Sequence, residues 1–217
     1  MSSPDRSRRP RRVLLVDMGG VFFSYSFLKA ITAWAAAAGQ DPEHVRARWL
    51  IDQPFDAFER GEIQPAAYLE HLRHLLAVDL TDEQLEQGWN AIYGTVDPAL
   101  LALLADPAVR SLFDAVVGVS NTNMLHARYW RELFREDLSV LDAVHCSHEI
   151  GATKPSAEFF AHVAAAHGTT RKDLVLVDDI PSVTADAAGL GIRSHTYQGA
   201  AALASYLHTL DTAKDRS

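Results

Sequence analysis

Short runs of consecutive apolar residues recur along the chain, and most of them lead straight into a polar side chain. They occupy positions 13–16, 115–119, 141–146 and 174–177. Asp17, Ser120 and Asp178 follow the first, second and fourth of these runs. An unbroken apolar run of this length is typical of a strand that is buried on both faces of a parallel sheet. We therefore expect four such strands.

Helical periodicity follows each of the three later runs, at positions 125–134, 155–167 and 181–190. A last short strand is expected at 192–197, after the Gly-Leu-Gly break. Strands that alternate with helices indicate crossover connections and a doubly wound parallel sheet. The predicted fold class is therefore α/β.

The long interval between the first and second strands contains no convincing strand and shows helical periodicity instead. Helices are expected at 27–38, 42–51, 65–76, 81–93 and 98–104. Thr81 and Gln84 have the spacing of a capping box at the start of one of them. The simplest interpretation is a helical cap over residues 23–107, inserted after the first strand of an α/β core that comprises 13–22 and 108–217.

The composition is that of an ordinary globular protein. Of the 217 residues, 48% are hydrophobic and 22% charged, which is enough apolar material for a core without disulfide or metal cross-links. Cys146 is the only cysteine, so an intrachain disulfide and a thiolate zinc site are both excluded. A reducing compartment fits this cysteine usage, and we expect a cytoplasmic protein.

The formal net charge of −8 argues against a general nucleic-acid-binding protein. One local exception is a cluster of arginines at positions 6, 8, 9, 11 and 12. It could form a nucleic-acid or membrane arm, but we interpret residues 1–12 as a disordered leader. The apolar stretch 13–23 is interrupted by Asp17 and a Gly-Gly pair, which argues against a signal peptide. We expect no membrane span, because no apolar stretch reaches about 20 residues.

Ligands of open α/β sheets bind beyond the carboxyl ends of the strands. In this chain those ends supply Asp17, Ser120 and the pair Asp178-Asp179, and Lys154 lies in the loop after the third strand. Carboxylates can hold Mg²⁺ together with water and substrate oxygens. A lysine can neutralise phosphoryl oxygens, and a carboxylate can attack phosphorus to form an aspartyl-phosphate. These residue types therefore indicate phosphoryl transfer.

Four motifs resemble those of the haloacid dehalogenase-like superfamily of hydrolases, in the expected order. They are Val-Asp17-Met-Gly-Gly-Val21, Val119-Ser120-Asn121-Thr122-Asn123, Lys154-Pro155 and Val177-Asp178-Asp179. Each lies at a predicted strand end or in the loop beyond it. Phe58-Glu59-Arg60-Gly61-Glu62-Ile63 further resembles the branch that contains α-D-glucose-1-phosphate phosphatases and the phosphatase domain of soluble epoxide hydrolases.

The resemblance implies a Mg²⁺-dependent phosphatase acting on a small phosphorylated metabolite, for which a sugar 1-phosphate is a candidate. It implies that Asp17 is the nucleophile and a metal ligand, and that the Gly19 main-chain carbonyl is another ligand. Asp179 would bind the metal directly, and Asp178 would act through a metal-bound water or orient the site. The transferring phosphoryl group would be held by Ser120, the Asn121 amide and Lys154.

Two positions depart from the family pattern. Gly19 stands where most active phosphatases of the superfamily carry a second aspartate, their general acid and base, and Val183 stands where relatives often have Asn. A positioned acid is worth about 10²–10⁴-fold in rate, so a good leaving group, such as a sugar anomeric oxygen, is favoured. A proton from the cap or from the substrate is the other solution.

Several alternatives remain open. The missing second aspartate also suits a metal-independent haloacid dehalogenase, or a degenerate protein that binds a phosphorylated ligand without turnover. Arg60 could reach the substrate from the cap or pair with a neighbouring glutamate. His126, His145 and His148 are interpreted as structural, because no further ligand pattern accompanies them.

Overall fold

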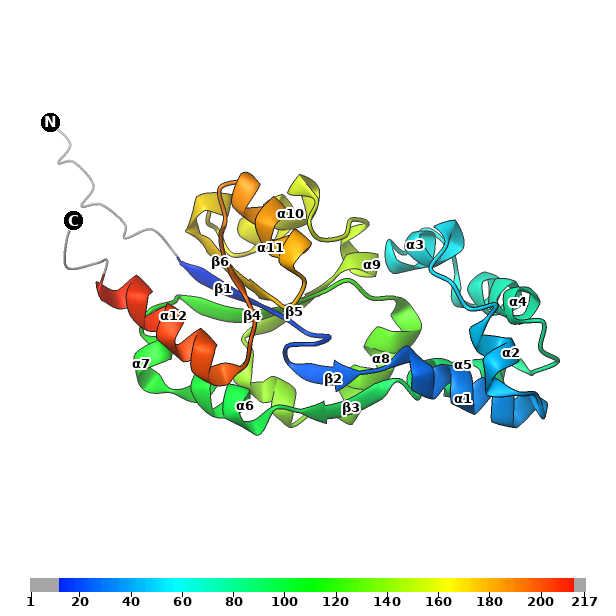
Figure 1. The fold of residues 1–217 in the computed structure, drawn as a ribbon. Helices are drawn as coiled ribbons and strands as arrows, with labels where there is room; N and C mark the ends of the chain where they lie inside the picture. Colours follow the sequence, from blue (N-terminus) through cyan, green and yellow to red (C-terminus); the bar gives the residue numbers. More distant parts are fainter. Residues whose placement is uncertain (1–11, 213–217) are drawn as a thin grey trace, which may run out of the picture.

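The computed structural model describes residues 12–212, so the predicted leader, apart from Arg12, lies outside the described residues. A five-stranded sheet forms the centre of the molecule, in the order β5-β4-β1-β6-β7, and all of its pairings are parallel (Figure 1). Its strands are β1 (Val13–Asp17), β4 (Ala115–Ser120), β5 (Ala143–Cys146), β6 (Leu174–Asp178) and β7 (Arg193–Thr196). The α/β fold class predicted from the apolar runs is therefore confirmed.

The first strand is buried on both faces because its side chains alternate between two hydrophobic clusters. Leu14 and Val16 face a cluster built with helices α6, α7, α8 and α12, whereas Val13 and Leu15 face one built with α10 and α11. The helices of the first face are α6 (Pro98–Ala105), α7 (Pro107–Arg110), α8 (Met124–Leu133) and α12 (Ala200–Thr212). Those of the second face are α10 (Ala157–Ala166) and α11 (Pro181–Gly189). The apolar run of β1 thus reflects helices on both sides of the sheet.

A separate group of helices packs around its own apolar centre beside the sheet (Figure 1). The group comprises α1 (Phe27–Ala38), α2 (Pro42–Arg46), α3 (Gln53–Glu59), α4 (Pro65–Leu76) and α5 (Asp82–Asn90). Trp34 and Trp89 stack at 5.9 Å between ring centroids, and the Trp34 indole donates to the Leu85 carbonyl at 2.9 Å. The predicted capping box of Thr81 and Gln84 is present at the start of α5. We refer to these five helices as the cap.

The interval that was predicted to lack strands contains two, so that expectation is wrong. Strand β2 (Phe23–Tyr25) precedes the cap helices in the sequence and β3 (Tyr93–Val96) follows them. The two strands pair antiparallel. Each is too short to display a period, and its partner is distant in the sequence, so local pattern cannot reveal the pair. The helix expected over 42–51 ends at Arg46, and α3 begins beyond it, where the Asp52 carboxylate accepts the Phe55 N–H.

Further elements went unpredicted, among them the short helix α7. The others are α9 (Ser147–Ile150), α12 near the end of the described residues, and two short 3₁₀ turns at Asp137–Val140 and Arg171–Asp173. Within residues 12–212, no helix combines the length and the apolar character needed to cross a membrane.

Packing of helix α6 bears on where the cap ends. Leu100 and Leu104 are fully buried in the cluster that also contains Leu14 and Val16 of β1. The division of the chain into cap and core remains a prediction. The packing favours an end of the cap before Pro98, because α6 belongs with the sheet and not with the cap helices.

Candidate active site

Three adjacent strands deliver polar side chains to one edge of the sheet. β1 ends at Asp17, β4 at Ser120 and β6 at Asp178, and β1 lies between the other two. Because the strands are parallel, their carboxyl ends meet at this edge. Lys154 reaches the same place from the loop before α10, and all four side chains are buried.

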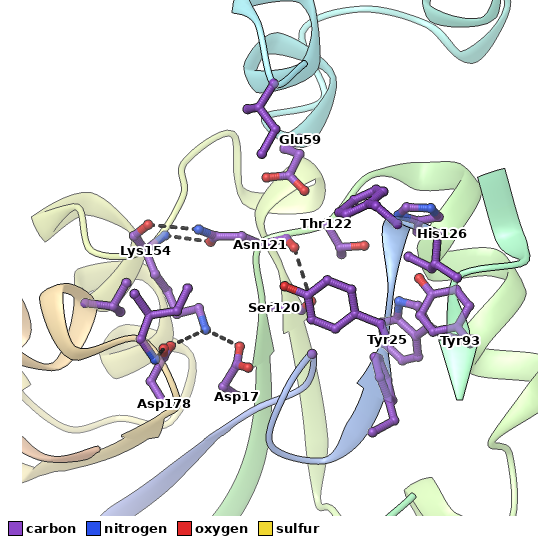
Figure 2. Close-up of a pocket in the computed structure, with 18 of the residues that line it drawn as sticks. Asp17, Tyr25, Glu59, Tyr93, Ser120, Asn121, Thr122, His126, Lys154 and Asp178 are labelled. Carbon is purple, nitrogen blue, oxygen red and sulfur yellow. Dashed lines mark hydrogen bonds and ion pairs between the residues drawn. The ribbon is translucent and has the colours of Figure 1, made fainter. Parts of the chain in front are cut away.

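Lys154 links two of the carboxylates (Figure 2). Its ammonium donates to the Asp17 carboxylate and to Asp178 Oδ2, the latter at 2.8 Å. Burial disfavours the charged ammonium, but the attraction of Asp17 and Asp178 outweighs it and raises the pKa of Lys154. Lys154 is therefore a fixed cation at the floor of the site.

The main chain of Lys154 is held in turn by Asn121. The Asn121 side-chain amide accepts the Lys154 N–H at 2.8 Å and donates to the Lys154 carbonyl at 2.9 Å. With both ends of its side chain engaged, Asn121 can offer its main-chain N–H to an anion. The structure thus gives this residue a supporting contact that the motif alone does not reveal.

The site carries more negative charge than one lysine neutralises. Burial raises the pKa of Asp17 to about 7, Lys154 opposes this rise, and Asp178 and Asp179 add to it. Burial and the neighbouring Asp178 likewise raise the pKa of Asp179. Three carboxylates around a single ammonium favour the approach of a further cation.

Asp179 provides a direct test of whether a cation fits. Its Oδ1 is buried and has no hydrogen-bond partner among the described residues. Gly20, at φ 93°, leaves the room that Asp179 occupies, since a Cβ there would lie 2.3 Å from Asp179 Oδ2. By contrast, Asp178 accepts from the Ile180 N–H at 3.0 Å and from Lys154. Asp179 therefore keeps a buried oxygen that is free for a ligand.

The donor set matches a hard divalent cation. Within residues 12–212, no three side chains of histidine, cysteine, aspartate or glutamate gather closely enough to hold a metal by themselves. Mg²⁺ does not require such a cage, because it usually takes one or two carboxylates and completes its octahedron with water, substrate or carbonyl oxygens. The residues present fit Mg²⁺ in this manner.

A cavity of about 260 Å³ opens above these residues, between the sheet edge and the cap. Its floor is polar and includes Asp17, Gly19, Ser120, Asn121, Lys154 and Asp178. Its remaining wall is mainly apolar and aromatic. Besides Glu59, Thr122 and His126, it is formed by Phe23, Tyr25, Phe27, Ile51, Phe55, Ile92, Tyr93, Trp130, Ile180 and Val183. The volume suits a small molecule with one anionic end.

The Tyr25 ring lies over Gly19, the position where the family's second aspartate is missing. A Cβ at Gly19 would lie 3.1 Å from Tyr25 Cε1. Tyr25 comes from β2, a strand that the sequence did not reveal. A side chain at position 19 would therefore require the Tyr25 ring to shift by a few tenths of an ångström.

Glu59 belongs to the 58–63 motif and was not predicted as a site residue, yet it lines the cavity together with the predicted site residues (Figure 2). It is the last residue of α3 and belongs to the cap. Burial raises the pKa of Glu59 to about 7, Asp56 adds to the rise and Lys154 opposes it. The 58–63 motif could have marked Glu59 as a candidate, but the motif does not show that this carboxylate faces Asp17.

The three histidines and Arg60 have other partners. His126 stacks on Trp89 and contacts the Trp89 carbonyl through Nε2 at 3.0 Å, and burial lowers its pKa to about 3. His145 contacts His167 at 2.9 Å, and His148 contacts the Thr122 carbonyl at 3.2 Å. Arg60 pairs with Glu62 and does not line the cavity, so its predicted contact with substrate gains no support.

Comparison with known proteins supports the fold. No family model matches the sequence. An enzyme of the haloacid dehalogenase-like (HAD) family from Bacteroides thetaiotaomicron, solved with magnesium and inorganic phosphate, is 24% identical over 87% of this chain and 94% of its own, with a TM-score of 0.72. A predicted HAD-like hydrolase from Porphyromonas gingivalis is 21% identical over 86% of this chain and 91% of its own (TM-score 0.67).

An L-2-haloacid dehalogenase from Xanthobacter autotrophicus, solved with chloropropionic acid covalently bound, is 15% identical over 85% of this chain and 76% of its own (TM-score 0.60). These similarities confirm, at the level of the fold, the resemblance to the haloacid dehalogenase-like superfamily that the four motifs indicated. The resemblance to the glucose-1-phosphate phosphatase branch stays a prediction.

Proposed function

We propose that this chain is a Mg²⁺-dependent phosphatase that hydrolyses a small phosphorylated metabolite through an aspartyl-phosphate on Asp17. The observation that carries the proposal is the buried contact of Lys154 with Asp17 and Asp178, beside an Asp179 oxygen that has no partner among the described residues. This arrangement supplies a nucleophile and a fixed cation at one end of the cavity. The free oxygen belongs to Asp179, the residue after Asp178, which lies outside the cavity lining, beside Gly20. The magnesium and phosphate bound by the similar Bacteroides enzyme support the same chemistry.

Mg²⁺ would be held by Asp17, the Gly19 main-chain carbonyl and Asp179, with Asp178 acting through a bound water or as an orienting group. When bound, it neutralises charge on the phosphoryl oxygens and on the carboxylates. This cation would also neutralise the negative charge of Asp178 and Asp179, which adds to the effect of burial on the pKa of Asp17.

The chain's own residues perform the remaining tasks. Asp17 attacks the phosphorus, and the bond from phosphorus to the leaving oxygen breaks. Ser120, the Asn121 main-chain N–H and the Lys154 ammonium hold the phosphoryl oxygens as negative charge develops. Lys154 also favours the ionised form of Asp17. Asp178 and Asn121 fix Lys154 in place.

The cavity narrows the range of substrates. Its apolar and aromatic wall suits a compact leaving group with a flat or weakly polar face, such as an aryl group or the ring of a sugar. A sugar 1-phosphate remains a candidate because its leaving oxygen requires little protonation.

Two alternatives have specific support. The similarity to the Xanthobacter enzyme and the glycine at position 19 fit a haloacid dehalogenase, in which Asp17 would attack carbon. Gly19 and Val183 fit a binding protein without turnover. The unpartnered Asp179 oxygen favours the phosphatase over the dehalogenase, because attack on carbon requires no cation at that place. The binding protein is separated from the phosphatase by turnover alone.

The test is a phosphate-release screen over sugar 1-phosphates, sugar 6-phosphates, nucleotides and aryl phosphates, with and without Mg²⁺. Release should require Mg²⁺ and vanish in Asp17→Asn, whereas Asp186→Asn, a change at an exposed position of α11, should leave it intact. Unchanged turnover in Asp17→Asn would contradict the proposal. Halide release in the presence of a chelator would indicate the dehalogenase, and ligand-induced thermal stabilisation without phosphate release would indicate the binding protein.

A further inference from the structure

The proposed phosphatase reaction requires a proton donor for the leaving group, and none of the residues assigned to the nucleophile, metal or phosphate supplies one. When the bond from phosphorus to the leaving oxygen breaks, that oxygen becomes an alkoxide unless it receives a proton. Gly19 has no side chain to supply one, and the Tyr25 ring lies directly beside the position that a Cβ there would take. A donor must therefore come from another wall of the cavity.

Most titratable groups of the cavity are committed elsewhere. Lys154 contacts both Asp17 and Asp178 at the floor. His126 has Nε2 on the Trp89 carbonyl and Nδ1 beside the Asn123 amide at 3.2 Å, so both ring nitrogens have partners. These groups cannot deliver a proton without breaking a contact that the site or the core uses.

Glu59 differs from them in its partners and in its position. Among the described residues, its carboxylate has no hydrogen-bond or ion-pair partner, although it is partly buried. Figure 2 shows it projecting from α3 into the cavity, on the side opposite the strand ends that carry Asp17 and Ser120. A phosphate ester bound at the strand ends would have its leaving group toward the cap, and therefore toward Glu59.

The backbone around Glu59 is fixed against the core. Ser147 Oγ contacts the Glu59 carbonyl at 2.6 Å and the Thr122 carbonyl at 2.9 Å. Gly61, at φ 69°, approaches the core so closely that a Cβ there would lie 2.3 Å from the His148 carbonyl oxygen. The end of α3 thus rests on α9 and on the loop after β4, and Glu59 faces Asp17 because of this docking.

The electrostatic surroundings suit a group that must be protonated at the start of the reaction and ionised afterwards. Burial and Asp56, on the same helix, raise the pKa of Glu59 to about 7, and Lys154 opposes them across the cavity. Tyr25 and Tyr93 face it from β2 and β3, and burial raises the pKa of each above its ordinary value. General acids work best when their pKa lies near the operating pH, so Glu59 is better matched than either tyrosine.

We infer that Glu59 is the proton donor for the leaving group, in place of the aspartate that the chain lacks at position 19. This inference rests on the proposed phosphatase function. As the Asp17 oxygen forms its bond to phosphorus, the ester bond breaks and its electron pair passes to the leaving oxygen. That oxygen takes the proton of the neutral Glu59 carboxyl and departs as an alcohol, which leaves Glu59 ionised.

The second half of the reaction restores the site. The Glu59 carboxylate takes a proton from a water molecule as the water oxygen attacks the aspartyl-phosphate. Phosphate departs, Asp17 returns to a carboxylate and Glu59 to its neutral form. Atoms and charge balance over the two steps, and no further reactant is needed.

The test compares two aryl phosphates that differ in their need for a proton. Phenyl phosphate has a poor leaving group, whereas the leaving group of 4-nitrophenyl phosphate departs readily as an anion. kcat/KM for release of the phenol reports only the steps up to cleavage of the ester bond. Glu59→Gln should lower kcat/KM by about 10²–10⁴-fold for phenyl phosphate and by much less for 4-nitrophenyl phosphate.

Glu62→Gln is the matched control, because Glu62 also belongs to the 58–63 segment but pairs with Arg60 and does not line the cavity. It should change neither rate. An equal loss on both esters in a Glu59→Gln variant with an unchanged Tm would overturn the inference in favour of a general role in binding. A selective loss on phenyl phosphate in Tyr25→Phe, but not in Glu59→Gln, would assign the proton to Tyr25 instead.

Failure of the proposed function would look different. It would appear as an absence of Mg²⁺-dependent phosphate release by the unmodified chain from every compound of the screen, both aryl esters included. Failure of the Glu59 assignment alone would leave that turnover intact and show no difference in leaving-group dependence between Glu59→Gln and the unmodified chain.

Discussion

The side-chain amide of Asn121 holds the main chain of Lys154 from both sides, accepting its N–H and donating to its carbonyl. This contact joins the loop after β4 to the loop before α10. It places the lysine where its ammonium reaches both Asp17 and Asp178. In the proposed function, phosphate binding and the position of the nucleophile would therefore depend on the same pair of residues.

Asn121→Ala removes both of these hydrogen bonds and should loosen Lys154 without altering the charge of the site. Each such bond is worth about 0.5–1.5 kcal/mol, so kcat/KM for phosphate release should fall by roughly 5- to 150-fold. Steady-state kinetics together with a thermal melt measures this. A variant with full activity would show that the lysine does not need the support.

Lys154→Met leaves the carboxylates of Asp17 and Asp178 buried without their cation. Breaking a buried ion pair in this way costs about 3–5 kcal/mol, so urea unfolding at neutral pH should show a clear loss of stability. Lys172→Met, at an exposed position, is the control and should lie close to the unmodified chain. Equal stabilities of the two variants would mean that the buried contact is not maintained in solution.

Gly61→Ala tests the docking of the cap. At φ 69° an alanine is strained by its backbone, and here its Cβ would also meet the His148 carbonyl. Gly39→Ala is a matched control, because Gly39 has φ 62° but nothing within 4 Å of the added Cβ. Thermal melts should show a larger loss for Gly61→Ala, and only this variant should lose activity. Equal losses of stability and activity in the two variants would show that backbone strain alone, and not the contact with His148, causes the effect.

Because His126 is buried as a neutral ring, we expect the protein to lose stability in acid. Its folded pKa of about 3 lies below its ordinary value of 6.5, so the unfolded chain binds the proton more readily. The stabilisation is fully present above about pH 6.5 and is lost progressively as the pH falls toward 3. Unfolding free energies at a series of pH values should therefore decline over this range, with a shallower slope in His126→Gln. Parallel slopes would show that His126 is not buried as a neutral ring.

The sequence predicted the part of the site that depends on local pattern. The apolar runs located β1, β4 and β6, and because parallel strands share an edge, Asp17, Ser120 and Asp178 had to meet. Glu59 and Tyr25 could not be placed in this way. Their positions depend on β2 pairing with β3 and on α3 resting against α9, contacts between segments that are distant in the chain.

The same limit applies to the arrangement of the helices. The capping box of Thr81 and Gln84 involves neighbours and was predicted correctly. Whether α6 belongs to the cap or to the sheet depends on what Leu100 and Leu104 touch, and the apolar period of a helix does not say which surface it covers.

Chemical trapping tests most directly whether a covalent intermediate forms on Asp17. A reaction with Mg²⁺ and a substrate found in the phosphate-release screen is quenched with borohydride, which reduces an aspartyl-phosphate to homoserine. Mass spectrometry of the peptide that contains Asp17 then identifies the modified residue. Homoserine is expected at position 17 only when substrate and Mg²⁺ are both present. Homoserine at another aspartate, or substrate turnover with position 17 unmodified, would contradict this expectation.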